Sequence, residues 1–371
     1  MKDGEEGNRM KMPETMKEIA IQDIASVRIG QAEDPEGGTG CTVLICEDGM
    51  CAGLDIRGGG PASRDTHLLD PQAAAQIIHG IVLGGGSAFG LGAANGVMQY
   101  LQEHDIGFDV AVTKVPLVCQ SDLFDLTVAD VSARPDAAMG YEAARRAMEE
   151  PNYKDGNFGA GCGATVGKLC GMETCMKTGI GSYAVQIGSL QIGAIVALNA
   201  LGDVYDWETS EKIAGLLTED KQGFRDTVEI LMQNIESVEN RFTEHAAEAD
   251  GAGGSAAPGT GGTTGGPAPG ADGFVGNTTL GVVITNGAFT KSQLCKIASM
   301  AHNGYARSIR PVHTTADGDS IYAVSAGQVD ADQDLVGTLA AEVMSEAIKR
   351  AVFSADSAYG FLAAKDLKLN K

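Results

Sequence analysis

The chain has 371 residues, of which 43% are hydrophobic, so it is long and apolar enough for a globular protein with a sizeable core. Its formal net charge of −22 argues against nucleic-acid and anionic-membrane partners, because few basic residues are available to neutralise phosphates. Glycine accounts for 51 residues, roughly twice its usual share. Much of that excess lies within apolar runs, where it indicates tight turns and close backbone approach.

Eight cysteines occur without a C-x-x-C pair, and Cys41 and Cys46 are spaced to lie on opposite faces of one strand. We therefore expect reduced, mostly buried thiols, with no zinc site and no disulfide. The N-terminal residues lack the apolar stretch of a signal peptide, and no run of apolar residues is long enough to span a membrane. These features predict a soluble cytoplasmic protein.

The chain is expected to open with a flexible arm over residues 1–18, because this stretch is polar and charged. Residues 24–29 alternate enough to predict a strand. Two apolar segments, residues 42–46 and 51–56, flank the turn signal Glu-Asp-Gly at 47–49. This pattern predicts a β-hairpin.

A glycine-rich segment, LGGGSAFGLG at residues 83–92, follows a predicted helix at residues 70–78 and is expected to join a strand to a second helix. It lacks the G-x-x-x-x-G-K-[ST] pattern of a phosphate-binding loop, and no strand-borne acidic residue completes a dinucleotide site. A nucleophile elbow is not formed either, because Phe89 occupies the last position of G-x-S-x-G. Gly86 and Ser87 are therefore predicted to pack tightly or to line a substrate pocket.

Three segments organise the middle of the chain. Residues 137–148 are predicted to be helical, and a second glycine-rich run, GAGCGATVGK, ends at Lys168. Residues 191–199 form an almost wholly apolar strand that ends in Asn199, and such a strand implies layers on both of its faces. The more polar residues 209–238 are predicted to be helical.

Residues 246–273 are dominated by Gly, Ala, Pro and Thr and lack large apolar side chains, which predicts a flexible linker. The segment after the linker is expected to form a strand (279–286), a helix, a strand (320–326) and a helix. Two strands and two helices make a thin core by themselves. Residues 19–245 and 274–371 are therefore predicted to form one layered α/β domain together.

The junction between linker and buried strand carries Asn277-Thr278. A threonine there is either an ordinary strand start or a residue that attacks the preceding carbonyl, which frees an α-amine that can act as the base of its own hydroxyl. Farther along, Asp317 and Asp319 flank a glycine just before an apolar strand. They form either a turn with local hydrogen bonds or a pair of carboxylates that orients the threonine. His313 is interpreted as structural, because the amine is available as a base.

Five segments resemble, in the same order, the DmpA-type L-aminopeptidase/D-esterase family, which includes β-peptidyl aminopeptidases and the nylon-oligomer hydrolase. They are LGGGSAFGLGAANGVMQYL, GAGCGATVGK, IVALNALGDV, GNTTLGVVITN and KSQLCKIASMAHNGYARSIRPVHTTADGDSIYAV. The resemblance covers about residues 24–240 and 274–365. It implies a four-layer αββα sandwich like that of the N-terminal-nucleophile hydrolases, self-cleavage into α and β chains that stay together, and assembly into a homo-oligomer of four or more copies.

The resemblance also implies roles for particular residues. The cut would fall between Asn277 and Thr278, and Thr278 would be the nucleophile. Asp317 and Asp319 match the groups that orient its hydroxyl and amine. Two aspartates at these positions are found in the members similar to the nylon hydrolase, whereas peptidase members have Ser and Glu.

Asn199 matches the amide of the family's oxyanion hole, and Lys168 matches an active-site lysine. The family's active-site tyrosine is absent, and its place falls near Asp122 or Phe124. This departure removes a phenolic donor from the region where the substrate is positioned.

Taken together, these features predict a self-processing N-terminal-threonine amidohydrolase. It would cleave amide or ester bonds of short peptides, aminoacyl amides or related oligomers through an acyl-enzyme, with no metal and no organic cofactor. One alternative is an acyltransferase that resembles the ornithine acetyltransferases and uses the same threonine. The other alternative is an unprocessed homologue that only binds a small molecule.

Overall fold

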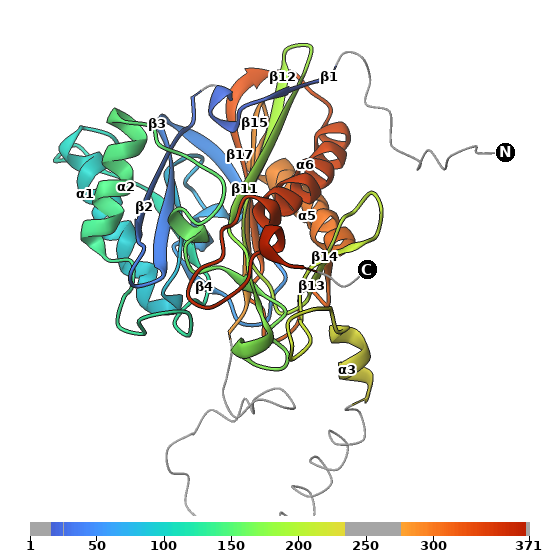
Figure 1. The fold of residues 1–371 in the computed structure, drawn as a ribbon. Coiled ribbons are helices and arrows are strands. Elements are labelled where there is room, and N and C mark those ends of the chain that lie inside the picture. The colour runs from blue at the N-terminus through green and yellow to red at the C-terminus, as the bar shows by residue number, and fades with distance from the viewer. Residues whose placement is uncertain (1–15, 25, 234–275, 369–371) are drawn as a thin grey trace, which may run out of the picture.

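The computed structural model describes residues 16–24, 26–233 and 276–368 (Figure 1). The helices are α1 (Ala93–Glu103), α2 (Ala137–Glu149), α3 (Thr227–Gln233), α5 (Lys291–Ser308) and α6 (Gln333–Phe353). The strands of the large sheet are β1 (Met16–Ile19), β2 (Arg28–Asp34), β3 (Thr39–Ile56), β4 (Ala62–Arg64), β5 (Ile78–Gly84), β8 (Val118–Asp122), β11 (Ile180–Ile187), β12 (Leu190–Asn199), β15 (Thr278–Gly287) and β17 (Ser320–Val329). The shorter strands are β6 (Phe108–Asp109), β7 (Lys114–Val115), β9 (Thr165–Val166), β10 (Met176–Lys177), β13 (Asp203–Tyr205), β14 (Lys212–Ala214) and β16 (Ile309–Arg310).

Strand β3 is shared by both halves of the large sheet, whose order is β1-β11-β12-β15-β17-β3-β5-β8-β4 with β2 also on β3. Its residues 39–45 pair with β2, and residues 51–56 pair with β17. The predicted hairpin is therefore wrong. The chain stays extended through residues 47–49, where the register against β5 shifts, because each apolar segment finds its backbone partners on a different strand.

Three apolar cores separate four layers of structure. Helices α1 and α2 pack on β2, β3 and β5, and helices α5 and α6 pack on the half that contains β11, β12, β15 and β17. A third core lies between the two halves of the sheet and contains side chains from both. Figure 1 shows α1 and α2 on one side of the strands and α5 and α6 on the other. The predicted αββα sandwich is confirmed.

Alternation along the strands assigns each side chain to one of these cores. On β12, Ile192, Ala194 and Val196 face the helices α5 and α6, whereas Ile195 and Ala197 face the other half of the sheet. Cys41 and Cys46 on β3 likewise belong to different cores, which confirms their prediction on opposite faces.

Side-chain caps fix the starts of the long helices. The Asp136 carboxylate accepts from Met139 N at the start of α2, 2.9 Å away, and Asp332 caps α6 in the same way. At the start of α5, Thr290 and Gln293 form a reciprocal capping box. These caps satisfy amide groups that have no partner within the helix.

Three predicted elements differ from the structure near the N-terminus. Met16–Ile19 is not part of an arm but pairs with β11, and the strand predicted at 24–29 begins at Arg28 instead. Residues 70–78 do not form a helix: a short 3-10 turn ends at Leu69, and the apolar residues from Ile78 onward form β5. Burial on both faces favours a central strand for this short apolar run.

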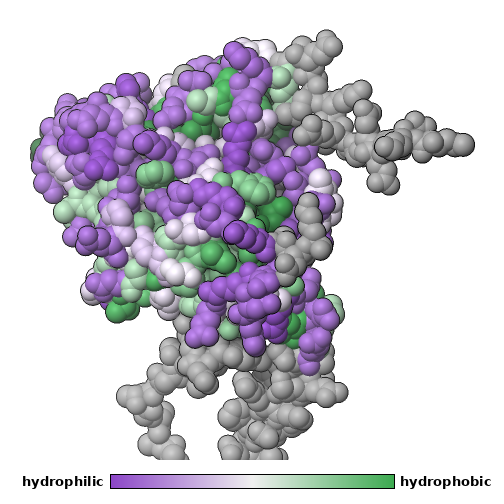
Figure 2. Space-filling model, in the orientation of Figure 1, coloured by the Kyte–Doolittle hydropathy of each residue, from purple (hydrophilic) through white to green (hydrophobic). Residues whose placement is uncertain are grey.

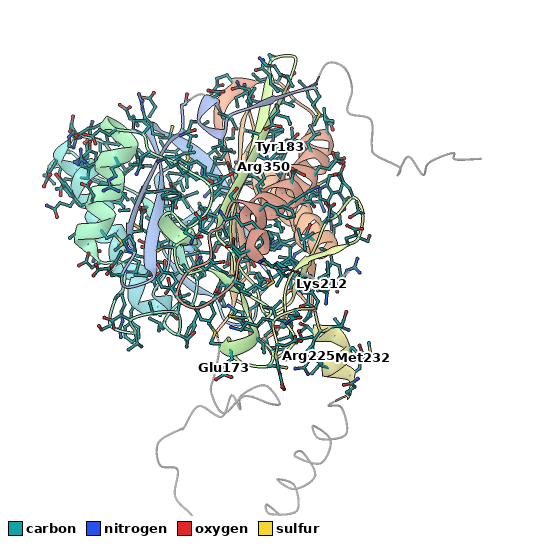
Figure 3. The ribbon with its side chains drawn as sticks, viewed as in Figure 1. Glu173, Tyr183, Lys212, Arg225, Met232 and Arg350 are labelled. Carbon is teal, nitrogen blue, oxygen red and sulfur yellow. The ribbon has the colours of Figure 1, made fainter. Side chains whose placement is uncertain are left out.

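The prediction of a helix over residues 209–238 is wrong for most of the segment that the structure describes. Lys212–Ala214 is strand β14, and only Thr227–Gln233 is helical. Lys212 Nζ donates to Asp203 Oδ2 and to the carbonyl oxygen of Arg225, each at 2.7 Å, which ties β14 to both neighbouring segments (Figure 3). Residues 234–238 and the predicted linker at 246–273 lie outside the described residues.

No helix among the described residues is both long and apolar enough to cross a membrane. On the face of the molecule shown in Figure 2, hydrophobic residues are dispersed among hydrophilic ones.

Helices α1 and α2 approach so closely that their contact excludes side chains. A Cβ atom added to Gly140 would lie 2.0 Å from the carbonyl oxygen of Ala93, and one added to Gly96 would lie 1.7 Å from that of Ala137. We expect Gly140→Ala to lower the free energy of unfolding by about 1–3 kcal/mol, because overpacking outweighs the gain in helix propensity. Urea denaturation measures this change. Gly92→Ala is the matched control, because nothing lies within 4 Å of its added Cβ; equal stabilities of the two variants would contradict the prediction.

Candidate active site

Most of the predicted site residues lie at one edge of the sheet, where β12 ends and β15 and β17 begin. β12 runs antiparallel to β15, so its last residue, Asn199, pairs with the first residue of β15, Thr278. β17 runs parallel to β15 and starts at the same edge, with Ser320 opposite Leu280. The Asp-Gly-Asp turn (residues 317–319) that precedes β17 therefore lies beside the Asn277–Thr278 peptide.

The Asn277–Thr278 peptide is buried, and its carbonyl group is held by two donors. Thr278 is only 4% exposed, and its hydroxyl donates to the carbonyl oxygen of Asn277 at 2.5 Å. Gly318 N donates to the same oxygen at 2.8 Å. On the other side, Asn277 N donates to the carbonyl oxygen of Ala316 at 3.2 Å. The nucleophile candidate thus lies against the carbonyl that it would have to attack.

Asp319 is fully buried and holds the start of β15. Its Oδ1 accepts from Thr279 N at 2.7 Å, and its Oδ2 accepts from His313 N at 3.0 Å and contacts His313 Nδ1 at 2.9 Å. His313 has a φ of 61°, a left-handed conformation that costs backbone energy. The carboxylate therefore orients the residue next to Thr278, and His313 in turn orients the carboxylate.

Asp317 is anchored by the turn before it. Its Oδ2 accepts from Thr314 N at 2.9 Å and from the Thr314 hydroxyl at 2.5 Å, and its Oδ1 accepts from Leu201 N at 3.4 Å. Burial, reinforced by the charge of Asp319, raises the pKa of Asp317 to about 6. Within the described part of the chain, neither Asp317 nor Asp319 is hydrogen-bonded to the Thr278 hydroxyl.

Lys168 lies beneath the end of β12. Its Nζ donates to Asn199 Oδ1 at 2.8 Å, to the Asn199 carbonyl oxygen at 3.1 Å and to the Gly276 carbonyl oxygen at 3.5 Å. The Asn199 Nδ2 group donates to the Phe124 carbonyl oxygen at 2.9 Å. Lys168 thus fixes both the predicted oxyanion amide and the segment that leads into Asn277.

Burial lowers the pKa of Lys168 to about 7, against the opposing effect of nearby acidic groups such as Asp317. A shift of that size corresponds to roughly 5 kcal/mol of differential interaction between the two protonation states. The lysine is therefore poised to be neutral or charged near physiological pH.

This shift predicts how stability depends on pH. Between about pH 7 and 10.5 the unfolded chain carries a proton on Lys168 that the folded chain does not, so raising the pH through this window stabilises the fold. We expect the free energy of unfolding to rise more steeply from pH 7 to 9 in a Thr278→Ala chain than in the same chain that also carries Lys168→Met, so that both proteins are compared as single chains. Urea denaturation at several pH values measures both slopes. Identical slopes would show that Lys168 keeps its ordinary pKa.

The pocket candidates fall into two groups. Phe124 borders the segment that leads into Asn277, since a Cβ atom on Gly276 would lie 2.6 Å from its ring. Asp122 is buried at the end of β8; Gln120 donates to its Oδ1 at 2.7 Å, and its Oδ2 has no hydrogen-bond partner among the described residues. Burial, with the nearby charge of Asp125, raises the pKa of Asp122 well above its ordinary value.

Gly86 and Ser87 contact the segment around Phe124 through their backbone N–H groups. Gly86 N donates to Asp125 Oδ1 at 2.7 Å, and Ser87 N donates to the Leu123 carbonyl oxygen at 2.9 Å. Both residues have positive φ values, 79° for Gly86 and 53° for Ser87. The glycine turn thus supports the segment that carries Phe124, and within the described residues no hydrogen bond joins this turn to Thr278.

Three contributors to the site have no counterpart among the predicted residues. They are the Gly318 amide, Thr314, and Asp125, whose Oδ2 also accepts from the Thr39 hydroxyl at 2.7 Å. A glycine between two candidate carboxylates was the signal available for Gly318. Thr314 contacts Asp317 within a local turn, whereas Asp125 acts through contacts with Thr39 and Gly86, which are far from it in the chain.

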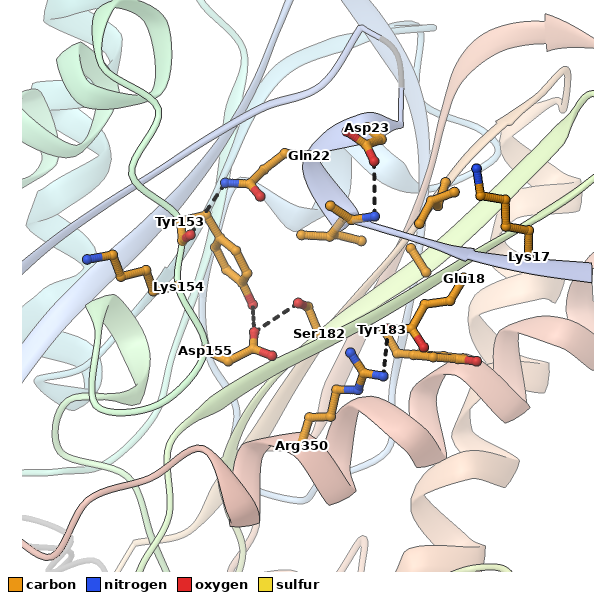
Figure 4. A pocket seen from close by; sticks show the side chains of 14 residues that line it. Lys17, Glu18, Gln22, Asp23, Tyr153, Lys154, Asp155, Ser182, Tyr183 and Arg350 are labelled. Carbon is orange, nitrogen blue, oxygen red and sulfur yellow. Dashed lines mark hydrogen bonds and ion pairs between the residues drawn. The ribbon is translucent and has the colours of Figure 1, made fainter.

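A separate hollow of about 720 Å³ lies between β1, β11 and α6 and contains none of the predicted site residues (Figure 4). Asp155 Oδ1 accepts there from Tyr153 Oη at 3.0 Å and from Ser182 Oγ at 2.8 Å. The Arg350 guanidinium pairs with Glu18 at 2.9 Å and lies 4.6 Å from the centre of the Tyr183 ring (Figures 3 and 4).

The same fold occurs in solved aminopeptidase structures. An L-aminopeptidase D-Ala-esterase/amidase from Ochrobactrum anthropi, described as a variant of the N-terminal-nucleophile hydrolase fold, matches with a TM-score of 0.60 at 16% identity, over 91% of this chain and 86% of that one. A β-aminopeptidase from Burkholderia sp. matches with a TM-score of 0.59 at 17% identity, over 93% and 90%. The fold is therefore that of the N-terminal-nucleophile hydrolases.

The chain belongs to peptidase family S58, whose sequence profile matches residues 20–365. It is 30% identical, over 373 residues and 92% of each chain, to an uncharacterized aminopeptidase from Mycobacterium leprae. It is 26% identical over 353 residues to a 6-aminohexanoate-oligomer endohydrolase from Paenarthrobacter ureafaciens, covering 91% of this chain and 87% of that one. The predicted family and the predicted hydrolase class are confirmed.

Proposed function

We propose that the protein is a self-processing amidohydrolase whose nucleophile is the N-terminal threonine formed when the Asn277–Thr278 bond is cut. One observation carries this proposal: the Thr278 hydroxyl lies 2.5 Å from the carbonyl oxygen of the preceding residue, and that oxygen also accepts from Gly318 N. A hydroxyl beside a polarised carbonyl is the arrangement that an intramolecular acyl shift requires.

Self-cleavage would proceed through an ester. The Thr278 Oγ–carbon bond forms as the bond from the Asn277 carbonyl carbon to the Thr278 nitrogen breaks, and the hydroxyl proton ends on that nitrogen. Water then hydrolyses the ester, which releases the Asn277 carboxyl group and restores the hydroxyl. The product carries a free α-amine beside the nucleophile.

Substrate turnover would use the same hydroxyl. The Thr278 α-amine takes its proton, Oγ attacks the substrate carbonyl, and the protonated amine gives the proton to the leaving group. The Asn199 amide would donate a side-chain N–H to the oxyanion, and the 2.8 Å hydrogen bond from Lys168 Nζ to Asn199 Oδ1 supports this role because it holds the amide in place. Asp319 holds Thr279 N and so sets the direction in which Thr278 begins β15. Water resolves the acyl-enzyme.

Substrates are proposed to be short peptides, aminoacyl amides or esters, and related oligoamides. The name of the 6-aminohexanoate-oligomer endohydrolase relative supports the last class. Dependence of p-nitroanilide turnover on an added amine acceptor would favour acyl transfer instead. A cytoplasmic homo-oligomer remains part of the proposal.

Denaturing gel electrophoresis of the purified protein tests self-processing. We expect two chains, the smaller one with Thr278 as its first residue by N-terminal sequencing. The two chains should co-purify, because β15 pairs along its length with β12 of the other chain. A single chain that persists on incubation would overturn the proposal.

A further inference from the structure

Gly318, at the centre of the Asp-Gly-Asp turn, approaches the Asn277–Thr278 peptide more closely than any side chain would allow. Its N–H donates to the Asn277 carbonyl oxygen at 2.8 Å. A Cβ atom added to Gly318 would lie 2.6 Å from Thr278 Oγ1 and 3.0 Å from the Gly60 carbonyl oxygen. The absence of a side chain therefore lets the amide reach the carbonyl while the hydroxyl keeps its place.

The Gly-Gly-Gly loop at residues 58–60 holds this turn from outside. Gly60 N donates to the Asp317 carbonyl oxygen at 2.9 Å, and Gly58 N donates to that of Asp319 at 3.2 Å. A Cβ atom on Gly58 would lie 2.3 Å from Asp319 N, so this contact is also backbone against backbone. Because the carbonyl groups on both sides of Gly318 are held, the direction of the Gly318 N–H is fixed before any reaction.

In the uncut chain, the side-chain amide predicted for the oxyanion hole uses one of its two N–H groups in a hydrogen bond outside the Asn277–Thr278 peptide. Asn199 Oδ1 accepts from Lys168 at 2.8 Å, and Asn199 Nδ2 donates to the Phe124 carbonyl oxygen at 2.9 Å. The Asn277 carbonyl oxygen accepts from the Thr278 hydroxyl and from Gly318 N. The hydroxyl is the attacking group, so it cannot also stabilise the negative charge that its attack creates.

We propose that the backbone N–H of Gly318 is the donor that stabilises the oxyanion during self-cleavage. The inference rests on the proposed function and adds a catalytic group to it. As Thr278 Oγ bonds to the Asn277 carbonyl carbon, the electron pair of the C=O bond moves onto the oxygen that Gly318 N–H already contacts. When the bond to the Thr278 nitrogen breaks, the C=O bond re-forms, and that nitrogen carries the former hydroxyl proton. A fixed donor at the developing charge accelerates such a step without reorganisation.

Replacing Gly318 with glycolic acid tests the proposal, because the resulting backbone ester removes the N–H and keeps the size of the residue. We expect self-cleavage to slow by about 10²–10³-fold. The rate is measured by the appearance of the chain that starts at Thr278. The same ester at Gly188, in the turn between β11 and β12 with nothing within 4 Å of an added Cβ, should cleave at the wild-type rate. Wild-type cleavage of the Gly318 ester would overturn the inference.

A second measurement needs no backbone change. In the Thr278→Ala precursor, a through-hydrogen-bond NMR coupling between the Gly318 ¹⁵N and the Asn277 carbonyl ¹³C is expected, and its absence would overturn the inference even if the ester variant did not fold. The two proposals fail separately. If Thr278→Ala is still cut, the proposed function is wrong; if Thr278→Ala stays whole while the Gly318 ester is cut normally, only the donor assignment is wrong.

Discussion

The Thr278→Ala variant is expected to remain a single uncut chain and to lose amide hydrolysis. The substitution removes the hydroxyl that lies 2.5 Å from the Asn277 carbonyl oxygen, and with it both the attack on the chain and the nucleophile for substrate. We expect turnover of an aminoacyl p-nitroanilide to fall by at least about 10⁴-fold, as for the loss of other catalytic nucleophiles. Gel electrophoresis and steady-state kinetics measure the two effects.

Two further variants control for this result. Thr278→Ser keeps a hydroxyl at the same position, so it should be cut and retain part of the activity. Thr279→Val replaces the neighbouring hydroxyl, whose oxygen is buried without a hydrogen-bond partner in the described chain, and should be cut like the wild type. Processing of Thr278→Ala at a normal rate would exclude Thr278 as the self-cleaving nucleophile.

Lys168→Met is expected to produce the second largest loss. It removes the charge-assisted hydrogen bonds that hold Asn199 Oδ1 and the Asn199 carbonyl oxygen, and Oδ1 then keeps the longer hydrogen bonds from Thr165 N and the Thr165 hydroxyl, at 3.1 and 3.4 Å. Losing a hydrogen bond to a charged group costs about 1.5–3 kcal/mol, which corresponds to a fall of roughly 10- to 150-fold in kcat/KM. Self-cleavage should slow as well, because Lys168 also contacts the Gly276 carbonyl oxygen at 3.5 Å.

Lys177→Met is the matched control. Lys177 is equally buried, and its Nζ donates to the carbonyl oxygens of Gly161, Ala164 and Thr178. Its loss should destabilise the fold, since three buried carbonyls lose a donor. The kcat of the folded fraction should nevertheless stay close to that of the wild type. If both variants lost activity only in proportion to their stability, Lys168 would be a structural lysine.

The layered fold could be predicted from the composition of a single strand. Residues 191–199 are apolar on both faces, and such a strand has to lie between two layers, as β12 does. The hairpin prediction failed because local alternation shows that residues 42–46 and 51–56 are strands but not which strands they pair with. Their partners on β2, β5 and β17 are decided by tertiary packing.

Thr278 and the two aspartates could be proposed from their places next to apolar strands, whereas the role of Asn199 came from the family resemblance. The structure brings these strand ends to one edge. The Gly318 amide could not be assigned in that way. A backbone donor has no residue type of its own, and its direction depends on the glycine loop at 58–60, which is distant in sequence.

Because β15 lies in the middle of the sheet, a cut before Thr278 would make refolding depend on protein concentration. Before the cut, β15 joins β12 and β17 as part of one covalent chain, so refolding does not depend on protein concentration. After the proposed cut, the strand in the middle of the sheet would belong to a second molecule, and the folded state would become a heterodimer whose recovery from denaturant depends on dilution. Processing would thus turn a reversible folding equilibrium into an association equilibrium. The order of events in the cell would then be fixed: the sheet has to assemble first, and the cut follows.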